Sequence, residues 1–352
     1  MPVISQLANA FAVCDQWHAS APNETWPNRF FVHCATAGGY VNNSPPHFPY
    51  LMPTIQGHLS AIDNGWKVYF HDIPQSLALA RLWTQRGNFR RFEEFAADAA
   101  AGQLPCYSFI EPRYFADLGL GMPNDQHPRH DVIFGEQLIA SVYNTVRQSP
   151  LWNNTLLVTT YDEHGGCYEH APPPLAVSPG DNRLHDGFAF DRYGVRVPAV
   201  IISPYIESGT ILRSGSAGLP HLGPPYPYDH TSVVATLRKC FNLGGALTNR
   251  DNAAPDLDAV LKLDTPTNNQ LGTIAVPAYE PSQQDMQDAI GRPLTDMQIA
   301  MHRLASILPA PGADLDDHIK NLASGAIKPI EPAAIVAEAK GFIVDRIASF
   351  FG

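Results

Sequence analysis

The sequence lacks features that mark several large classes of protein. Positive charge is scarce: 23 Lys and Arg stand against 34 Asp and Glu, a net charge of −11. A groove that follows nucleic-acid phosphates needs clustered cations, so this balance argues against nucleic-acid binding. No run approaches the ~18 apolar residues that a membrane-spanning helix requires, so no integral membrane span is expected.

Cysteine is also sparse. The five cysteines are scattered, no two form a CxxC pair, and their number is odd. This pattern predicts neither a disulfide framework nor a zinc ribbon, and free thiols in a reducing compartment are expected. The opening residues lack the basic and apolar regions of a signal peptide. We therefore expect a cytoplasmic protein for the sequence as written, and a periplasmic or secreted one if the true N-terminus lies upstream.

Several catalytic signatures are missing as well. The sequence contains no GxSxG elbow, no Walker A loop, no GxGxxG after a strand and no HExxH. What it does contain is a globular composition, with 45% hydrophobic and 16% charged residues in 352. Its 32 Pro and 26 Gly predict many long connections, which in α/β enzymes often carry the chemistry.

Alternating strand and helix patterns predict an α/β fold. Four apolar segments are expected to be buried strands: 67–70, 106–110, 155–161 and 197–203. The last two are near-continuous β-branched runs, which are typical of strands covered on both faces of a largely parallel sheet. Helical periodicity predicts helices at 3–13, 132–148 and 232–241. The fold class expected is a central, largely parallel sheet flanked by helices.

The C-terminal part of the sequence has a different pattern. Helical spacing dominates beyond residue 283, at 284–308 and again at 333–351. We therefore expect an α/β domain at 1–282 and a C-terminal helical extension at 283–352. The last helix places apolar residues on one face, which predicts a docking helix or a homo-oligomer contact.

Titratable side chains follow three of the four predicted strands. His71 and Asp72 follow the first, Glu111 the second, and Asp162 with its neighbours the third. Ligands of open α/β sheets bind beyond the carboxyl ends of the strands. One shared site is therefore expected at that edge.

The segment Asp162-Glu163-His164-Gly165-Gly166 is the strongest candidate for chemistry. Two adjacent carboxylates at the end of a buried strand repel each other unless a cation or a proton separates them. Hard oxygen ligands suit a divalent metal ion, and the glycines allow a sharp turn near a ligand. The alternative is an ordinary polar transition from strand to loop, with both carboxylates in solvent.

Thr25 lies where a helix is expected to begin, in Thr25-Trp26-Pro27-Asn28. The simpler interpretation is that its side chain caps the helix. A helix N-terminus also binds anions, and a hydroxyl there beside a metal ion is a competent nucleophile. Ser20 is the next candidate for that role.

The 14 histidines are numerous for an acidic protein. His71 closes a strand, His127 lies in a polar loop, and His164 and His170 flank the carboxylates. Histidine titrates in the range needed to protonate a leaving group or to activate water. The segment 228–232 (YDHTS) is interpreted as a structural helix start.

Eight separated blocks of the sequence occur in the order of a known family. They are 11–17 (FAVCDQW), 25–29 (TWPNR), 69–74 (YFHDIP), 124–128 (NDQHP) with Gly135-Glu136, 160–174 (TYDEHGGCYEHAPPP), 194–198 (GVRVP), 202–204 (ISP) and 229–232 (DHTS). Together they cover most of residues 1–260. With these blocks the sequence resembles the phosphoesterase family that groups bacterial phospholipases C with acid phosphatases.

This resemblance implies an alkaline-phosphatase-like core and a set of site residues. The family's hydroxyl nucleophile matches Thr25, and its Asp-Glu metal ligands match Asp162 and Glu163. Pocket histidines match His71 and His127 as catalytic groups. Asn28, His164 and His170 are expected to bind substrate. One divalent metal ion, of unknown identity, is the expected cofactor.

The sequence also departs from the family pattern. Family members carry a strand with a Glu-Asn pair upstream of the nucleophile, in an ENRSFDH-like motif that completes the metal site, and the 24 residues before Thr25 contain no such motif. The resemblance then implies a late start or truncation, a non-catalytic homologue, or a site completed by a partner chain. The working hypothesis is metal-dependent hydrolysis of a phosphate ester, a small molecule or a phospholipid head group, through a phospho-threonine. The alternative is an inactive phosphate- or lipid-binding homologue.

Overall fold

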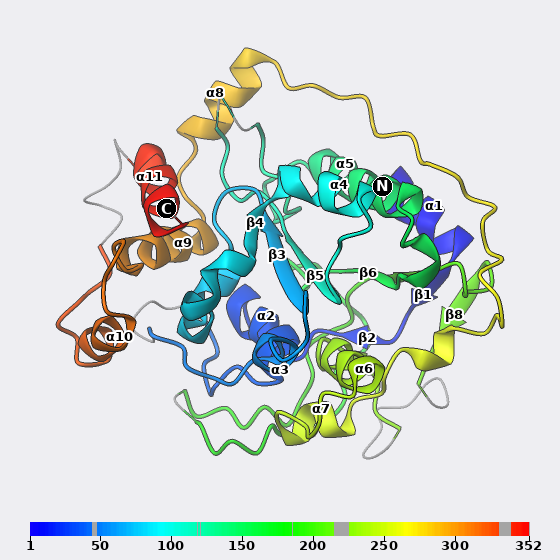
Figure 1. The fold of residues 1–352 in the computed structure, drawn as a ribbon, viewed down its shortest axis with the longest axis horizontal. Helices are drawn as coiled ribbons and strands as arrows, with labels where there is room; N and C mark the ends of the chain where they lie inside the picture. The colour runs from blue at the N-terminus through cyan, green and yellow to red at the C-terminus, as the bar shows by residue number, and fades with distance from the viewer. Residues whose placement is uncertain are drawn as a thin grey trace.

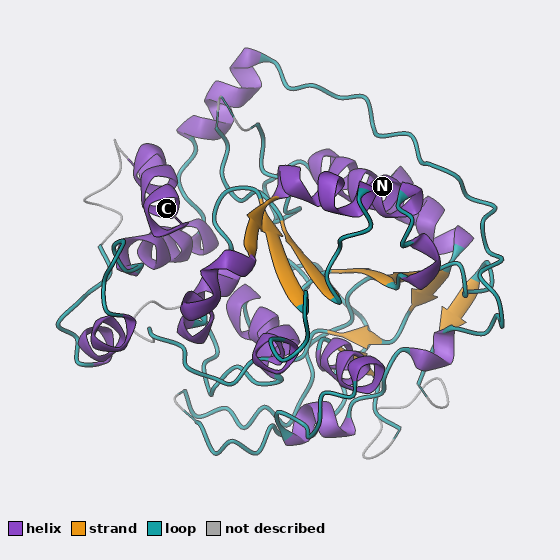
Figure 2. Cartoon of the chain, in the orientation of Figure 1, coloured by secondary structure: helices purple, strands orange, loops and turns teal. Residues whose placement is uncertain are grey.

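A computed structural model describes residues 1–43, 48–117, 119, 121–184, 186–214, 225–330 and 339–351. Helices lie on both sides of a set of short strands (Figures 1 and 2). On one side lie α1 (Pro2–Ala10), α4 (Phe92–Ala100) and α5 (Val132–Gln148), and on the other lie α2 (Thr25–Cys34), α3 (Ile55–Leu59) and α6 (Thr231–Phe241). The mixed α/β class is confirmed, and the alkaline-phosphatase-like arrangement stays a prediction.

The strands form three small sheets. The four-stranded sheet has the order β6 (Leu157–Thr160), β7 (Ala199–Ile202), β1 (Ala12–Cys14), β8 (Thr210–Leu212). The three-stranded sheet has the order β4 (Phe89–Arg91), β3 (Trp66–Phe70), β5 (Tyr107–Glu111). The third sheet pairs β2 (Trp17–His18) with β9 (Tyr228–Asp229).

The expectation of a largely parallel sheet is only partly right. Strand β3 pairs in parallel with β4 and β5, but β7 pairs antiparallel with both β6 and β1. Strand β7 is fully buried, as predicted, whereas every residue of β6 is partly exposed. Among the described residues, β6 pairs with β7 alone and β5 pairs with β3 alone. Both are therefore edge strands, and their apolar side chains are half-buried.

One predicted helix has the expected bounds, a second differs by one residue, and two others differ more. Helix α5 spans the predicted 132–148, and α6 begins one residue early. The helix expected at 3–13 ends at Ala10, because the next residues form β1. The helix expected at 284–308 is divided into α8 (Gln283–Gly291) and α9 (Asp296–Ile307), because Pro293 between them cannot continue a helix. The remaining helical segments are α7 (Asn249–Ala253), α10 (Leu315–Ala323), α11 (Ala339–Phe351), η2 (Gln75–Ala78), η3 (Ala80–Asn88), η4 (Trp152–Asn154) and η5 (Asp258–Val260).

The C-terminal helices share a hydrophobic core with the α/β part. Met301 of α9 and Ile347 of α11 belong to the same buried cluster as Trp26 and Phe70. The Phe351 ring stacks on Phe70 at 5.1 Å between centroids. In the described part of the last helix, the predicted apolar face therefore docks on the chain's own core. Ile335 and Val336, which were predicted to belong to this face, lie outside the described residues. The homo-oligomer contact and the domain boundary at 282 stay predictions.

A membrane-spanning segment was not expected from the sequence. In the described ranges, every helix is too short or too polar to cross a membrane.

Candidate functional site

Thr25 is the first residue of α2 and its hydroxyl is not used as a cap. The preceding residue, Glu24, is the N-cap and makes no side-chain capping bond. The next backbone N–H, of Trp26, donates to the Asn43 side chain at 2.8 Å. The Thr25 hydroxyl makes no hydrogen bond to another described residue, and the side chain is 7% exposed. The capping interpretation of Thr25 is therefore wrong, and its oxygen stays available at a helix N-terminus.

The loop before Thr25 is held by the carboxamide of Asn28. Its Oδ1 accepts the Ala21 N–H at 2.9 Å, and its Nδ2 donates to the carbonyls of Ala21 and Asn23 at 3.1 and 3.0 Å. Asn28 is fully buried. Its polar atoms thus fix the approach of the chain to α2, and its predicted contact with substrate stays a prediction.

Arg29 lies one helical turn after Thr25, on the same face of α2. Its guanidinium pairs with the Glu111 carboxylate at 2.6 Å and donates to the Tyr114 hydroxyl, which itself donates to Glu111 at 2.7 Å. Burial alone would lower the pKa of Arg29, but Glu111, Tyr114 and Asp162 raise it above its ordinary value. Burial would likewise raise the pKa of Glu111, and Arg29 lowers it below its ordinary value. Both side chains are therefore charged in the interior.

Asp162 follows β6 and faces the same guanidinium. Burial raises the pKa of Asp162, the neighbouring Glu163 raises it further, and Arg29 and His230 partly offset this. Asp162 Oδ1 accepts the Glu163 N–H at 3.0 Å, and Glu163 Oε2 accepts the Gly165 N–H at 2.7 Å. Gly165 and Gly166 have φ of 60° and 77°, a conformation that favours glycine. The two carboxylates thus lie on a tight turn at the end of β6.

The described residues do not by themselves form a complete metal site. The raised pKa of Asp162 indicates a carboxylate whose charge is incompletely balanced, and a nearby cation would balance it. However, in the described ranges no three His, Cys, Asp or Glu side chains come together as metal ligands. Asp162 and Glu163 are two carboxylates that could bind a metal ion, and the expected metal ion stays a prediction.

His71 lies at the carboxyl end of β3, next to the backbone of Glu111. Its Nδ1 donates to the Glu111 carbonyl at 3.0 Å, and its ring stacks on Phe92 at 4.2 Å. Because the carbonyl only accepts, Nδ1 carries the proton and Nε2 has the free lone pair. Burial lowers the pKa of His71 to about 4. At neutral pH this histidine is therefore suited to accept a proton rather than to donate one.

His127 lies in the loop that packs beside the carboxylate turn. A Cβ on Gly165 would lie 2.9 Å from Pro128 Cγ, so the two loops are in direct contact. The His127 Nδ1 donates to the Pro128 carbonyl at 3.0 Å. This contact places the His127 loop next to Asp162 and Glu163. Neither Thr25 nor Asp162 lines either of two cavities that share Phe134.

The predicted substrate-binding residues His164 and His170 lie on the solvent side of the same loop. His164 is exposed and its Nδ1 donates to the Cys167 carbonyl at 2.8 Å. The His170 side chain is 79% exposed, 3.1 Å from Glu169. Neither is enclosed as a binding group in this structure, and their role stays a prediction.

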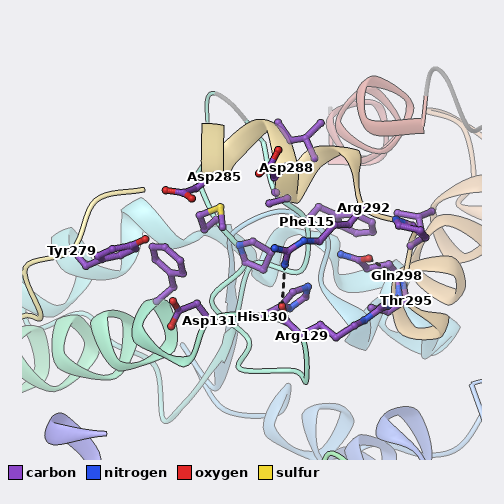
Figure 3. A pocket seen from close by; sticks show the side chains of 18 residues that line it. Phe115, Arg129, His130, Asp131, Tyr279, Asp285, Asp288, Arg292, Thr295 and Gln298 are labelled. Atoms are coloured by element: carbon purple, nitrogen blue, oxygen red, sulfur yellow. Dashed lines mark hydrogen bonds between the residues drawn. The ribbon is translucent and has the colours of Figure 1, made fainter. Parts of the chain in front are cut away.

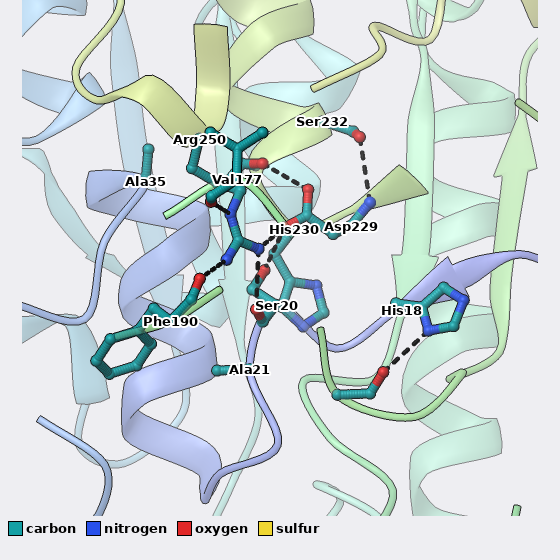
Figure 4. A network of polar contacts seen from close by, with 12 residues as sticks. His18, Ser20, Ala21, Ala35, Val177, Phe190, Asp229, His230, Ser232 and Arg250 are labelled. Carbon is teal, nitrogen blue, oxygen red and sulfur yellow. Dashed lines mark hydrogen bonds and ion pairs between the residues drawn. The ribbon is translucent and has the colours of Figure 1, made fainter. Parts of the chain in front are cut away.

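A buried ionic network lies behind the site and includes Ser20 (Figure 4). Arg250 and Asp229 are both fully buried and lie 3.5 Å apart. Arg250 donates to the carbonyls of Ser20, Val177 and Phe190, and the Ser20 hydroxyl donates to Asp229 at 2.9 Å. Ser20 is fully buried. It is thus a partner of Asp229, and the structure gives no support to its role as a second nucleophile.

His230 connects this network to Asp162. The Trp17 indole N–H donates to His230 Nδ1 at 3.2 Å, and His230 Nε2 donates to the Asp162 carbonyl at 2.7 Å. Both ring nitrogens are occupied in the neutral form, and burial lowers the pKa of His230. The helix start predicted at 228–232 is confirmed at Thr231, whereas Tyr228 and Asp229 form β9. His230 also fixes the backbone of the carboxylate turn.

Acid pH is expected to destabilise the fold through buried neutral histidines. Burial lowers the pKa of His33 to about 4, as it does for His71. The unfolded chain binds these protons near pH 6.5, so stability falls as pH drops from about 6.5 to about 4. For His33 the loss is on the order of 3 kcal/mol, by 1.36 kcal/mol per pKa unit.

Urea unfolding at about pH 7 and pH 5 measures this effect. The variant His33→Gln keeps an acceptor for the Gln56 side chain, which donates to His33 Nδ1 at 2.7 Å. It should lose less stability between the two pH values than the wild type does. An equal loss in both proteins would contradict the role of His33.

Comparison of the sequence with known proteins identifies the family of this chain. The sequence model of the Phosphoesterase family matches residues 1–244. The chain belongs to this family. Non-specific phospholipase C3 of Arabidopsis thaliana is 36% identical over 357 residues, which cover 96% of this chain and 65% of the relative. Non-specific phospholipase C6 of the same plant is 39% identical over 321 residues, 88% of this chain and 60% of the relative.

More distant relatives of this family member are bacterial. Phospholipase C A of Mycobacterium tuberculosis is 26% identical over 328 residues, covering 79% of this chain and 58% of the relative. The chain thus spans about 60% of the length of these relatives. A crystal structure of Ps i-CgsB in complex with k-i-k-neocarrahexaose covers 72% of this chain and 69% of that chain, at 11% identity and a TM-score of 0.41.

Sequence reasoning missed the buried charges of the site. Arg29 is part of the block that marked Thr25, and its spacing of four residues from Thr25 on a helix was a usable signal. His230 lies in the block 229–232, which the sequence marked only as a helix start, and Arg250 carried no local signal because its partners are distant in sequence.

Proposed function

We propose that the protein hydrolyses phosphate esters, with phospholipids as substrates, through a phospho-threonine formed on Thr25. The observation that carries the proposal is the Thr25 hydroxyl, which makes no hydrogen bond to another described residue and lies at the N-terminus of α2, one turn from a buried arginine. Membership of the phosphoesterase family and relatives named phospholipase C support the reaction class.

The surroundings of Thr25 favour an incoming phosphoryl group. A helix N-terminus carries a partial positive charge, which stabilises the phosphoryl oxygens as the P–O bond to Thr25 forms. Arg29 adds a fixed positive charge in the same region, and Glu111 holds it in place. These groups are already arranged before substrate binds, so little reorganisation is needed in the transition state.

Two histidines divide the proton transfers in this proposal. His71 is neutral with a free Nε2, so it accepts a proton from the water that hydrolyses the phospho-threonine. In the first step the Thr25 oxygen bonds to phosphorus and its hydroxyl proton passes to solvent, while His127, on the loop beside Asp162, donates a proton to the leaving alcohol oxygen. In the second step the P–O bond to Thr25 breaks and the Thr25 oxygen takes a proton back. A divalent metal ion at Asp162 and Glu163 would stabilise charge on the phosphoryl oxygens, and it stays a prediction.

Turnover assays with purified protein test the proposal. We expect hydrolysis of p-nitrophenyl phosphorylcholine and release of diacylglycerol from phosphatidylcholine, with lower rates on p-nitrophenyl phosphate. Absence of turnover on all three, with Mg²⁺, Mn²⁺, Ca²⁺ and Zn²⁺ supplied in turn, would favour an inactive phosphate- or lipid-binding homologue.

Metal removal is a separate prediction. Chelation with EDTA is expected to stop turnover, and the chosen divalent ion to restore it. Asp162→Asn should lower both the bound metal, measured by elemental analysis, and turnover by about 100-fold or more. Glu169→Gln is the matched control, since Glu169 lies on the same loop but pairs with Arg196 at 2.8 Å. Full activity of chelated protein would contradict metal dependence.

A further inference from the structure

A groove of about 820 Å³ lies between α5 and the extended segment 276–281. Its lining is mainly apolar and includes Phe92, Phe134, Leu138 and Val276. The volume is within the range of small-molecule sites, which are mostly apolar with a few polar groups. The groove is therefore suited to a ligand with a hydrocarbon body.

The outer wall of the groove is tied to α5 by specific contacts. The Gln137 side chain donates to the carbonyls of Pro277 and Tyr279, both at 2.9 Å. The Tyr279 ring also packs on Phe134 at 5.7 Å between centroids. Segment 276–281 is thus fixed over the groove although it has no regular secondary structure.

The polar end of the groove adjoins the proposed reaction site. His71 and Arg113 both line it, and His71 bonds the carbonyl of Glu111, the residue whose carboxylate holds Arg29. Arg113 donates through Nη1 to the Met122 carbonyl at 3.0 Å. Its Nε is buried and has no hydrogen-bond partner among the described residues. This Nε has almost no accessible surface, so a ligand in the groove meets the other guanidinium N–H groups of Arg113, which lines the groove.

We propose that this groove binds the diacylglycerol part of a phospholipid, with Arg113 donating to a glycerol-ester oxygen and the first part of an acyl chain lying along Phe134, Leu138 and Val276. The inference rests on the proposed function, because His71, which takes a proton from the attacking water in that proposal, lines the groove. Diacylglycerol is uncharged and largely apolar, which matches a lining with few charged groups.

A second cavity shows why the hydrocarbon belongs in the larger groove. It has about 390 Å³ and shares Met122, Phe134 and Tyr279 with the groove. Figure 3 shows Tyr279 at one end and Thr295 with Gln298 at the other. Its lining includes the charged residues Arg129, Asp131, Asp285, Asp288 and Arg292. Burying an acyl chain against these groups would remove them from water without compensation.

Binding of dioctanoylglycerol to the variant Thr25→Ala tests the proposal without any need for turnover. We expect Ser141→Trp, in the Thr25→Ala background, to raise the Kd at least tenfold, because Ser141 lines the groove and the indole fills it. Val276→Asp is a second variant, and its 47% exposure makes the change compatible with folding. Gln148→Trp is the matched control, on the same helix but exposed and outside the groove. Dihexanoylglycerol should bind more weakly, by about threefold to fourfold for each methylene that no longer enters the groove.

The outcomes separate this inference from the proposed function. Weaker binding in both groove variants, with the control unchanged, supports the groove as the diacylglycerol site. Binding that neither Ser141→Trp nor Val276→Asp weakens, or no binding at 1 mM, overturns it. A wild-type protein that binds dioctanoylglycerol in this groove but hydrolyses no ester would contradict the proposed function and leave the groove assignment standing.

Discussion

Replacement of Thr25 by alanine is expected to abolish phosphate-ester turnover, with a loss on the order of 10³-fold or more. The reason is that the phosphoryl group would have no oxygen to transfer to at the N-terminus of α2. The fold should be little affected, because the Thr25 hydroxyl makes no hydrogen bond to another described residue. Hydrolysis of p-nitrophenyl phosphorylcholine measures the loss, and the urea midpoint measures stability.

Two further variants make this test specific. Thr25→Ser keeps a hydroxyl in place and should retain turnover that is readily measured. Acid-quenched wild-type protein should carry one phosphoryl group on the peptide that contains Thr25, as mass spectrometry can detect. If Thr25→Ala kept its rate and Ser20→Ala lost it, the nucleophile would be Ser20.

Replacement of Arg29 by methionine is expected to cost about 3–5 kcal/mol of folding free energy. The change leaves the fully buried Glu111 carboxylate without the cation that it pairs with at 2.6 Å. Turnover should also fall in the protein that still folds, because Arg29 balances the charge of Asp162. Urea unfolding at pH 7 gives the first quantity and the phosphorylcholine assay the second.

The double variant Arg29→Met, Glu111→Leu separates stability from function. Removing both charges of a buried pair usually costs less than removing one, so the double variant should be more stable than Arg29→Met alone. Its turnover should stay low, because the positive charge near Thr25 is still absent. A loss of folding free energy below about 1 kcal/mol for Arg29→Met would contradict a buried Arg29–Glu111 ion pair. So would losses for Arg29→Met and Glu111→Leu that add up to the loss for the double variant.

The sequence predicted the long periodic elements best. The bounds of α5 agree with the prediction, because an amphipathic run of this length has a clear helical period. Strand direction was not predictable in the same way: β6 and β7 are both apolar runs, yet they pair antiparallel. Pairing depends on the path of the chain between strands, which local composition does not encode.

The candidate site was only partly predictable for a related reason. Thr25 and Asp162 could be found because each lies at the end of a predictable element. Arg29 and Glu111 are 82 residues apart, and Arg250 and Asp229 are 21 apart. A buried charge is recognised by its partner, and the partner is known only from the tertiary structure.

The edge strands β5 and β6 have a consequence for handling the protein in solution. Among the described residues, strands β5 and β6 are each paired on one side only, and they carry half-buried apolar side chains such as Phe109 and Val158. Such edges accept another extended chain by backbone hydrogen bonding, whether or not that chain is the intended one. Edge-to-edge association of protein molecules is therefore expected in concentrated samples. The rate at which monomer is lost measures how accessible β5 and β6 are to another chain.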